Sequence, residues 1–194
     1  MLSRILGAAA AVLIAIAPSA SARAQDDDIL QYLVNNPSVD SWQVLGVARA
    51  PRPQRAEGVL GDRAVRVVAR RSNQPWGVAA QMPISGAIKQ GDTILLAVWA
   101  RLAVAPEGAS SSRIPLRVQE NTPPYAALAE DAGSIGPAWG MIYASGVAAK
   151  DHAAGSTNLS VHLAVADQTV ELGPALLLNF GQNYDPAKLP RNAQ

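Results

Sequence analysis

Residues 93–101 read TILLAVWAR, and this stretch decides the fold. Ile94, Leu96 and Val98 alternate with the side chains of the opposite face, which ends at Arg101. A period of two is typical of a β-strand with one face in a core, because successive side chains of a strand point to opposite sides. We therefore predict a strand over residues 93–101.

Seven further segments on either side of this strand have the same short, apolar or alternating character. Turn-forming Gly, Pro, Asn and Ser residues separate them, and the chain holds 15 Gly and 14 Pro but a single Phe. Many short strands divided by such turns favour an all-β sandwich or barrel over a helical bundle. The predicted strands are residues 42–47, 64–70, 76–82, 113–120, 140–144, 158–165 and 169–178.

The composition excludes several classes of function. With 49% apolar residues the chain can build a core. Its formal net charge of +1 does not indicate the basic surface that nucleic-acid binding requires. The absence of cysteine rules out disulfides, zinc–thiolate sites, iron–sulfur clusters and thiol catalysis. The sequence also lacks a phosphate loop, a Gly-x-Ser-x-Gly elbow and a visible pair of catalytic carboxylates, so we expect no enzyme.

The N-terminus has the pattern of a cleaved signal peptide. Arg4 provides a positive start, residues 5–17 form an apolar run, and Ala22-Arg23-Ala24 fits the small-x-small cleavage pattern. The run is shorter than the roughly 20 residues that span a bilayer. We therefore expect residues 1–24 to be removed before Gln25, no membrane span in the mature chain, and a secreted or periplasmic location.

The mature chain divides into three predicted parts. Residues 25–40 form a lead-in, in which Asp26-Asp27-Asp28 caps a short helix over residues 29–34 or, as a weaker alternative, binds calcium. Residues 41–182 form the sandwich, and residues 183–194 form a C-terminal tail.

Several predicted strands carry a polar outer face. Gln119 follows the parity of Arg117 on one strand, His162 follows that of Asn158 on another, and Trp99 lies on the same side as Arg101. An aromatic ring stacks on the apolar face of a sugar, while amide and guanidinium groups match its hydroxyls. The same pattern is also compatible with an ordinary solvated sheet face.

Seven short motifs, in order, resemble the carbohydrate-binding modules of the CBM4/9/22-like group, which have a galactose-binding-like jelly-roll fold. They lie between Gly61 and Leu172, at residues 63–67, 73–76 with Gln81, 88–93, 98–101, 119–120 with 124–125, 138–139 and 159–163. By this resemblance, the candidate ligand-binding residues are Trp76, Gln81, Trp99, Arg101, Gln119, Glu120, Tyr125 and His162.

The resemblance implies a two-sheet antiparallel β-sandwich that holds a β-linked poly- or oligosaccharide on its concave sheet, with the candidate strands side by side. It leaves a structural calcium ion open, although the family's paired aspartates are replaced here by residues 170–172, Val-Glu-Leu. A cell-envelope structural or protein-interaction domain on the same sandwich is the main alternative, and a glycoside-acting enzyme is the third.

The signal peptide can be tested by mass. The intact mass of the protein recovered from the cell envelope or the medium should correspond to a chain that begins at Gln25, because cleavage follows Ala24. Recovery of a mature form that retains Met1 would contradict this expectation.

Overall fold

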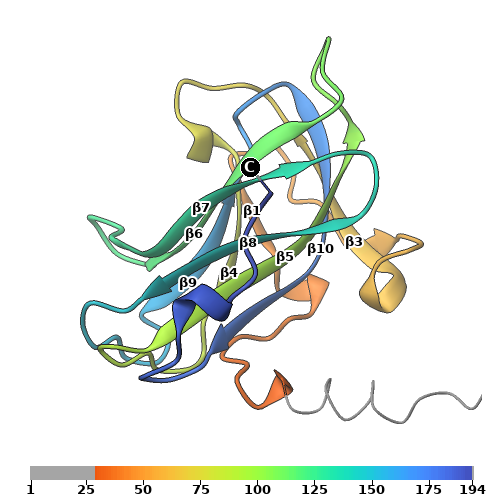
Figure 1. Ribbon diagram of the computed structural model, residues 1–194. Helices are drawn as coiled ribbons and strands as arrows, with labels where there is room; N and C mark the ends of the chain where they lie inside the picture. The colour runs from red at the N-terminus through yellow and green to blue at the C-terminus, as the bar shows by residue number, and fades with distance from the viewer. Residues whose placement is uncertain (1–28, 194) are drawn as a thin grey trace, which may run out of the picture.

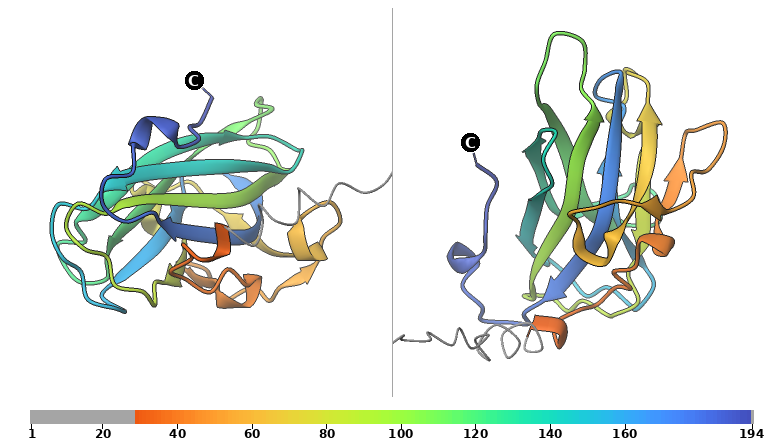
Figure 2. Two further views of the ribbon diagram at one scale, coloured as in Figure 1. Left: turned by 60° about the horizontal axis from the view of Figure 1, so that its bottom comes forward. Right: turned by 90° about the vertical axis from the view of Figure 1, so that its right-hand side faces the viewer.

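The computed structural model describes residues 29–193. The chain forms two antiparallel sheets of five strands each. The two sheets pack face to face, as Figures 1 and 2 show. The prediction of an all-β, two-sheet sandwich is therefore confirmed. Residues 1–24, the predicted signal peptide, lie outside the described residues.

The first sheet has the order β1-β4-β9-β6-β7, so strands distant in the sequence are neighbours. Its strands are β1 (Gln43–Leu45), β4 (Ala79–Pro83), β9 (Thr157–His162), β6 (Ser112–Glu120) and β7 (Ala127–Ile135).

The second sheet has the order β2-β3-β10-β5-β8. Its strands are β2 (Gln54–Arg55), β3 (Arg63–Ala69), β10 (Gln168–Asn179), β5 (Thr93–Val104) and β8 (Gly140–Val147). Four short 3₁₀ turns complete the described chain: η1 (Val39–Ser41), η2 (Leu60–Asp62), η3 (Pro75–Gly77) and η4 (Pro186–Lys188).

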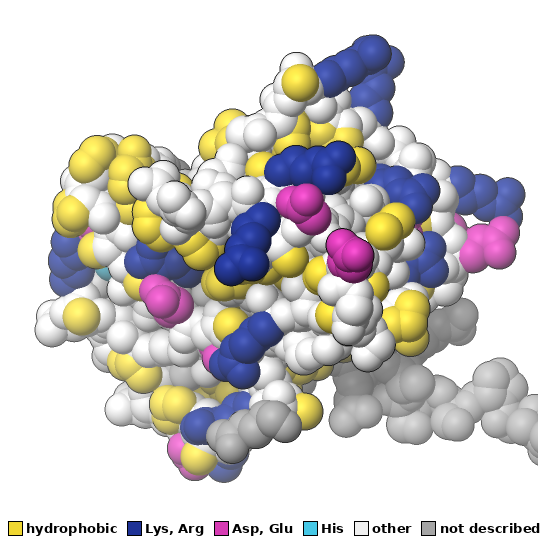
Figure 3. Space-filling view, turned by 90° about the horizontal axis from the view of Figure 1, so that it is seen from above, with side chains coloured by type: hydrophobic (Ala, Val, Ile, Leu, Met, Phe, Trp, Pro, Cys, Tyr) yellow, Lys and Arg dark blue, Asp and Glu magenta, His cyan; other side chains and the backbone are white. Residues whose placement is uncertain are grey.

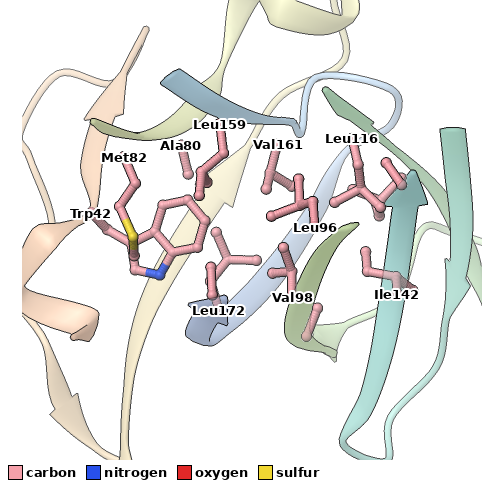
Figure 4. Packing of buried hydrophobic residues seen from close by; sticks show 14 of the residues in the cluster. Trp42, Ala80, Met82, Leu96, Val98, Leu116, Ile142, Leu159, Val161 and Leu172 are labelled. Atoms are coloured by element: carbon pink, nitrogen blue, oxygen red, sulfur yellow. The ribbon is translucent and has the colours of Figure 1, made fainter. Parts of the chain in front are cut away.

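The core lies between the two sheets and follows the period-two pattern of the strands. Met82 and Leu159 of the first sheet and Leu96 and Leu172 of the second are fully buried there, and Figure 4 shows their side chains facing one another. Trp42 closes one end of this core, and its indole Nε1 donates a hydrogen bond to the carbonyl of Gly173 at 2.9 Å. Inward apolar side chains thus leave the polar ones outside.

Most predicted strands are present, with bounds shifted by a few residues, but two were missed. β7 reads ALAEDAGSI, and its alanines, glycine and acids have little preference for strands. Its pairing with β6, from Ser112↔Ile135 to Gln119↔Ala127, imposes the extended conformation from outside. The two-residue β2 is too short to leave a pattern in the sequence.

The predicted lead-in helix through residue 34 is wrong. The chain makes one turn, with the Tyr32 amide donating to the Ile29 carbonyl, and then extends. Leu33 forms a bridge with Leu178, and the Asn35 side chain accepts from Leu177 N and donates to Ala175 O. Hydrogen bonds to β10 thus replace those of a helix. Asp26-Asp27-Asp28 lies outside the described residues.

The C-terminal tail packs on the outer face of the second sheet, where Figure 1 shows it in dark blue in front of β8. Tyr184 stacks on Phe180 with ring centroids 4.4 Å apart, and Leu189 is buried. The Asn192 amide accepts from the Tyr143 N–H at 2.9 Å and donates to the Tyr143 carbonyl at 2.7 Å. The tail therefore satisfies backbone groups on the edge of β8.

The two sheets approach closely where β7 meets β8. An added Cβ at Gly146 would lie 2.3 Å from the Leu128 carbonyl oxygen and 3.2 Å from Ala129. At Gly140, on the same strand, an added Cβ would meet nothing within 4 Å. A glycine is therefore required at Gly146 for space.

Gly146→Ala should destabilise the fold by about 1–3 kcal/mol, because the new methyl group collides with backbone that cannot move away freely. Gly140→Ala, the matched control, should change the free energy of unfolding by about 0.5 kcal/mol or less. Urea unfolding of the two variants measures both values. Equal effects at the two positions would contradict the close approach.

Candidate functional site

An open groove of about 550 Å³ lies on the outer face of the first sheet. Its floor comes from β4, β9 and β6, and its rim comes from β1, η3 and the loop between β6 and β7. The lining residues are Leu45, Trp76, Ala79, Gln81, Arg117, Gln119, Asn121, Pro124, Tyr125, Asn158 and His162.

The strand register arranges the floor in three cross-strand rows. Asn158 pairs with Gln119, then Gln81 with Ser160 and Arg117, and then Ala79 with His162. Rows two residues apart along a strand lie about 6.6 Å from each other. The floor is therefore a regular set of polar side chains whose inward neighbours are core residues.

The amides of Gln119 and Asn158 have no hydrogen-bond partner among the described residues. Gln119 is only 5% exposed, and its Oε1 is buried, as is Oδ1 of Asn158. Buried polar groups in proteins are nearly always hydrogen-bonded, so an unpaired pair of amides facing each other across two strands is unusual. Both residues line the groove, and neither of these oxygens is engaged by another group there.

Two exposed aromatic side chains stand at the rim. Trp76, 56% exposed, is carried by η3, which starts at Pro75 and is closed by a hydrogen bond from Gly77 N to Gln74 O. Tyr125, 47% exposed, lies in a tight loop closed by the hydrogen bond from Glu120 N to Ala126 O. Short hydrogen-bonded turns therefore hold both rings without burying them.

His162 lines the groove beside Trp76. Its ring makes an edge contact with Trp76 at 6.1 Å between centroids. Burial and, to a smaller extent, the nearby Arg117 lower the pKa of His162, Glu130 opposes both, and the result is a pKa of about 4. The imidazole is therefore neutral at neutral pH and can both donate and accept a hydrogen bond.

Arg117 is the one cationic residue that lines the groove among residues 29–193, and no carboxylate lines it. Its Nε lies 2.9 Å from Oε2 of Glu130, the residue opposite it on β7. Gln81 donates to Ser160 Oγ at 3.5 Å in the same row. On the loop face drawn in Figure 3, basic and acidic side chains are interspersed rather than gathered in one basic patch.

Five of the eight candidate residues meet in the groove: Trp76, Gln81, Gln119, Tyr125 and His162. Glu120 does not line it. Its carboxylate lies 2.7 Å from Lys150 Nζ and 3.7 Å from His152 Nδ1, and the hydrogen bond from Lys150 lowers the pKa of Glu120. This side chain ties the end of β6 to the loop after β8.

The expectation that Trp99 and Arg101 lie beside the other candidates in one sheet is wrong. Both are on β5, which pairs with β10 and β8 in the second sheet. There Arg101 Nε lies 2.7 Å from Glu171 Oε2, and its guanidinium covers the Trp139 ring at 4.6 Å. The alternation places a side chain on a face of its own strand but does not say to which sheet that strand belongs.

The candidate set missed Arg117, Asn158, Asn121 and three smaller contributors to the lining. Arg117 and Asn158 could have been found, because they share the outward parity of Gln119 and His162. Asn121 and Pro124 lie in a loop, and Leu45 and Ala79 are apolar, so the sequence carries no signal that they face a groove.

The stretch at residues 170–172, where the sequence resemblance leaves a structural calcium ion open, does not suit a cation. Glu171, the only carboxylate in the corresponding stretch, is 5% exposed and is shared by Arg101 and Arg66, at 2.7 and 3.8 Å. No group of three acidic or histidine side chains within residues 29–193 could hold a metal ion. Over that range, no helix is long and apolar enough to cross a membrane.

No protein family and no curated protein matches the sequence of this chain. Solved structures do resemble it. A CBM4 module has a TM-score of 0.54 and 16% identity over 72% of this chain and 94% of its own. The CBM22-1 xylan-binding domain of a Paenibacillus barcinonensis protein has a TM-score of 0.53 and 10% identity over 77% and 92%.

The chain has the fold of the CBM4 and CBM22 carbohydrate-binding modules. The N-terminal CBM22-1 and GH10 modules of xylanase 10B from Clostridium thermocellum, in complex with xylohexaose, show a TM-score of 0.56 and 18% identity over 76% of this chain. This chain spans 29% of that two-module protein. The likeness to these carbohydrate-binding modules is therefore one of fold.

The depressed pKa of His162 predicts a specific loss of stability in mild acid. The unfolded state takes up a proton near pH 6.5 but the folded state only near pH 4, so stability falls as the pH drops between these values. From pH 7 to pH 5, the wild type should lose about 2 kcal/mol more than His162→Gln. Urea unfolding at both pH values measures this difference.

The wild type and His162→Gln share the second histidine and all carboxylates. The difference between their losses of stability therefore comes from His162 alone. Equal losses in the two proteins would show that His162 is not buried as the structure has it.

Proposed function

We propose that this protein is an exported, non-catalytic binder of β-linked poly- or oligosaccharide chains, which it holds in the groove of the first sheet. One observation carries the proposal: two exposed aromatic rings, Trp76 and Tyr125, stand at the rim of a groove whose floor includes two amides with buried, unpaired oxygens, Gln119 and Asn158. The fold shared with CBM4 and CBM22 modules supports it.

Sugar rings suit both parts of this arrangement. Their C–H faces are apolar and pack on aromatic rings, which bury area at little entropic cost. Their hydroxyls both donate and accept hydrogen bonds, and so match an amide that presents one acceptor and two donors. Binding would give partners to the buried oxygens of Gln119 and Asn158 once these side chains turn toward the ligand, and would remove the cost of leaving them unpaired.

The chemistry of the groove supports binding without catalysis. Glycoside hydrolysis uses two carboxylates placed on either side of the scissile bond. The lining residues described above contain none, and Glu120, the acid among the candidate residues, is held by Lys150. Export follows from the predicted signal peptide and agrees with a ligand that lies outside the cell.

Affinity electrophoresis and titration calorimetry with xylo- and gluco-oligosaccharides test the proposal. The wild type should bind at least one of these chains without releasing reducing ends. Trp76→Ala should weaken binding about 10-fold or more, because a stacking surface is lost. Met141→Ala removes an exposed apolar side chain of β8, in the other sheet, and should leave affinity unchanged.

Failure to bind any glycan in a broad array, by a protein shown to be folded, would overturn the proposal. Turnover that disappears in Glu120→Gln would replace it with the enzyme alternative.

Gln119→Ala and Val118→Ala, adjacent on β6, should separate binding from folding. Gln119→Ala should cost about 1–3 kcal/mol of binding free energy, since sugar hydroxyls lose their partner. Its unfolding free energy should change by about 1 kcal/mol or less, because removal of a buried, unpaired amide oxygen offsets the loss of side-chain packing. Val118→Ala should cost roughly 1–2 kcal/mol of stability through lost core packing, with little effect on affinity.

Calorimetry and urea unfolding of both variants measure the four values. The reverse assignment, with Gln119 needed for folding and Val118 for binding, would rule out the outward orientation of Gln119.

A further inference from the structure

The charge of the groove is asymmetric. A binder of neutral sugars needs no net charge, yet the groove holds one guanidinium, Arg117, and no carboxylate among its described lining residues. His162 cannot balance or add to this charge, because its low pKa keeps it neutral above about pH 4. Among the lining residues, a ligand therefore meets one positive charge, and the neighbouring carboxylate of Glu130 lies outside the lining.

Arg117 keeps most of its hydrogen-bonding capacity. Its Nη2 donates to the Tyr125 carbonyl at 3.4 Å, the only hydrogen bond of this side chain within residues 29–193. Its Nε is buried and makes no hydrogen bond, although it lies 2.9 Å from the Glu130 carboxylate. A guanidinium has five N–H donors arranged to match two carboxylate oxygens, so donors remain for a ligand.

The existing ion pair with Glu130 does not occupy Arg117 fully. Glu130 is on β7, outside the groove lining, and its side chain is 60% exposed, whereas that of Arg117 is 24% exposed. An exposed carboxylate keeps its hydration and contributes little to an ion pair. A carboxylate that enters the groove would meet the same guanidinium in a less hydrated place, where charge attraction is stronger.

We propose that the groove prefers acidic glycans, in which a uronic acid presents its carboxylate to Arg117 while neighbouring sugars contact the rim aromatics and the floor amides. The row that contains Arg117 is next to the Gln119–Asn158 row in the same floor, and the two rows are about 6.6 Å apart. One chain of linked sugars can span this distance. This inference rests on the proposed function, since it specifies the ligand of the same groove.

The test compares two probes that differ only in charge: a xylo-oligosaccharide with a glucuronic acid branch, and the same compound with its carboxyl reduced to a primary alcohol. At low salt and pH 7, the wild type should bind the acidic probe about 10-fold more tightly. This preference should shrink as salt rises, because ions screen the attraction.

Two substitutions should move the preference in opposite directions. Arg117→Gln should bring the affinity ratio of the two probes to within about 2-fold. Glu130→Gln should raise the ratio, because it removes the carboxylate that competes for Arg117. Arg113→Gln is the control: Arg113 is exposed on the same face of β6, four residues from Arg117 and outside the groove lining, so the ratio should not change.

The possible failures are distinct. Equal binding of the two probes by the wild type, or a ratio that survives Arg117→Gln, overturns the acidic preference and leaves the proposed function intact. Absence of binding to both probes and to every neutral glycan overturns the proposed function itself.

Discussion

The antiparallel pairing of β6 with β9 is the constraint on which both the core and the groove depend. It places Leu116 opposite Val161 inside the sandwich, and Gln119 opposite Asn158 outside it. A shift of one residue would reverse both sets, bury the amides in the core and expose the apolar side chains. The energy of burying the apolar row therefore also fixes the position of the polar row.

The connection between β5 and β6 is the second constraint. The two strands follow one another in the chain but belong to different sheets, so their outer faces point to opposite sides of the molecule. The cluster of Arg101, Trp139 and Glu171 on the second sheet resembles a sugar site in composition. Its charged groups already satisfy one another: Glu171 is buried with Arg101 at 2.7 Å, and Trp139 Nε1 donates to the Glu57 carbonyl. The cluster packs η2 and its flanking loops onto the sheet.

The groove has the opposite character. The amide oxygens of Gln119 and Asn158 have no partner, its two large aromatic rings are exposed, and its histidine is neutral. A packing cluster and a binding site can thus share the same residue types and differ in whether their hydrogen bonds are already made. Only coordinates show this difference, since a sequence contains the donors and acceptors but not their partners.

The sequence by itself determined the sandwich class, the approximate place of most strands, and the face of each strand on which a side chain lies. These properties are local, because alternation and turn residues act within a few positions. It also supplied Gln119 and His162 as groove candidates through their parity, and Gln81 through the family resemblance. It could not reveal β7, whose conformation comes from pairing with β6, or the extended lead-in, which is held by β10. Tertiary structure alone decided which strands share a sheet, and so separated Trp99 and Arg101 from the groove and joined Arg117 and Asn158 to it. Sheet membership depends on contacts between segments far apart in the chain, and a pattern with a period of two contains no information about them.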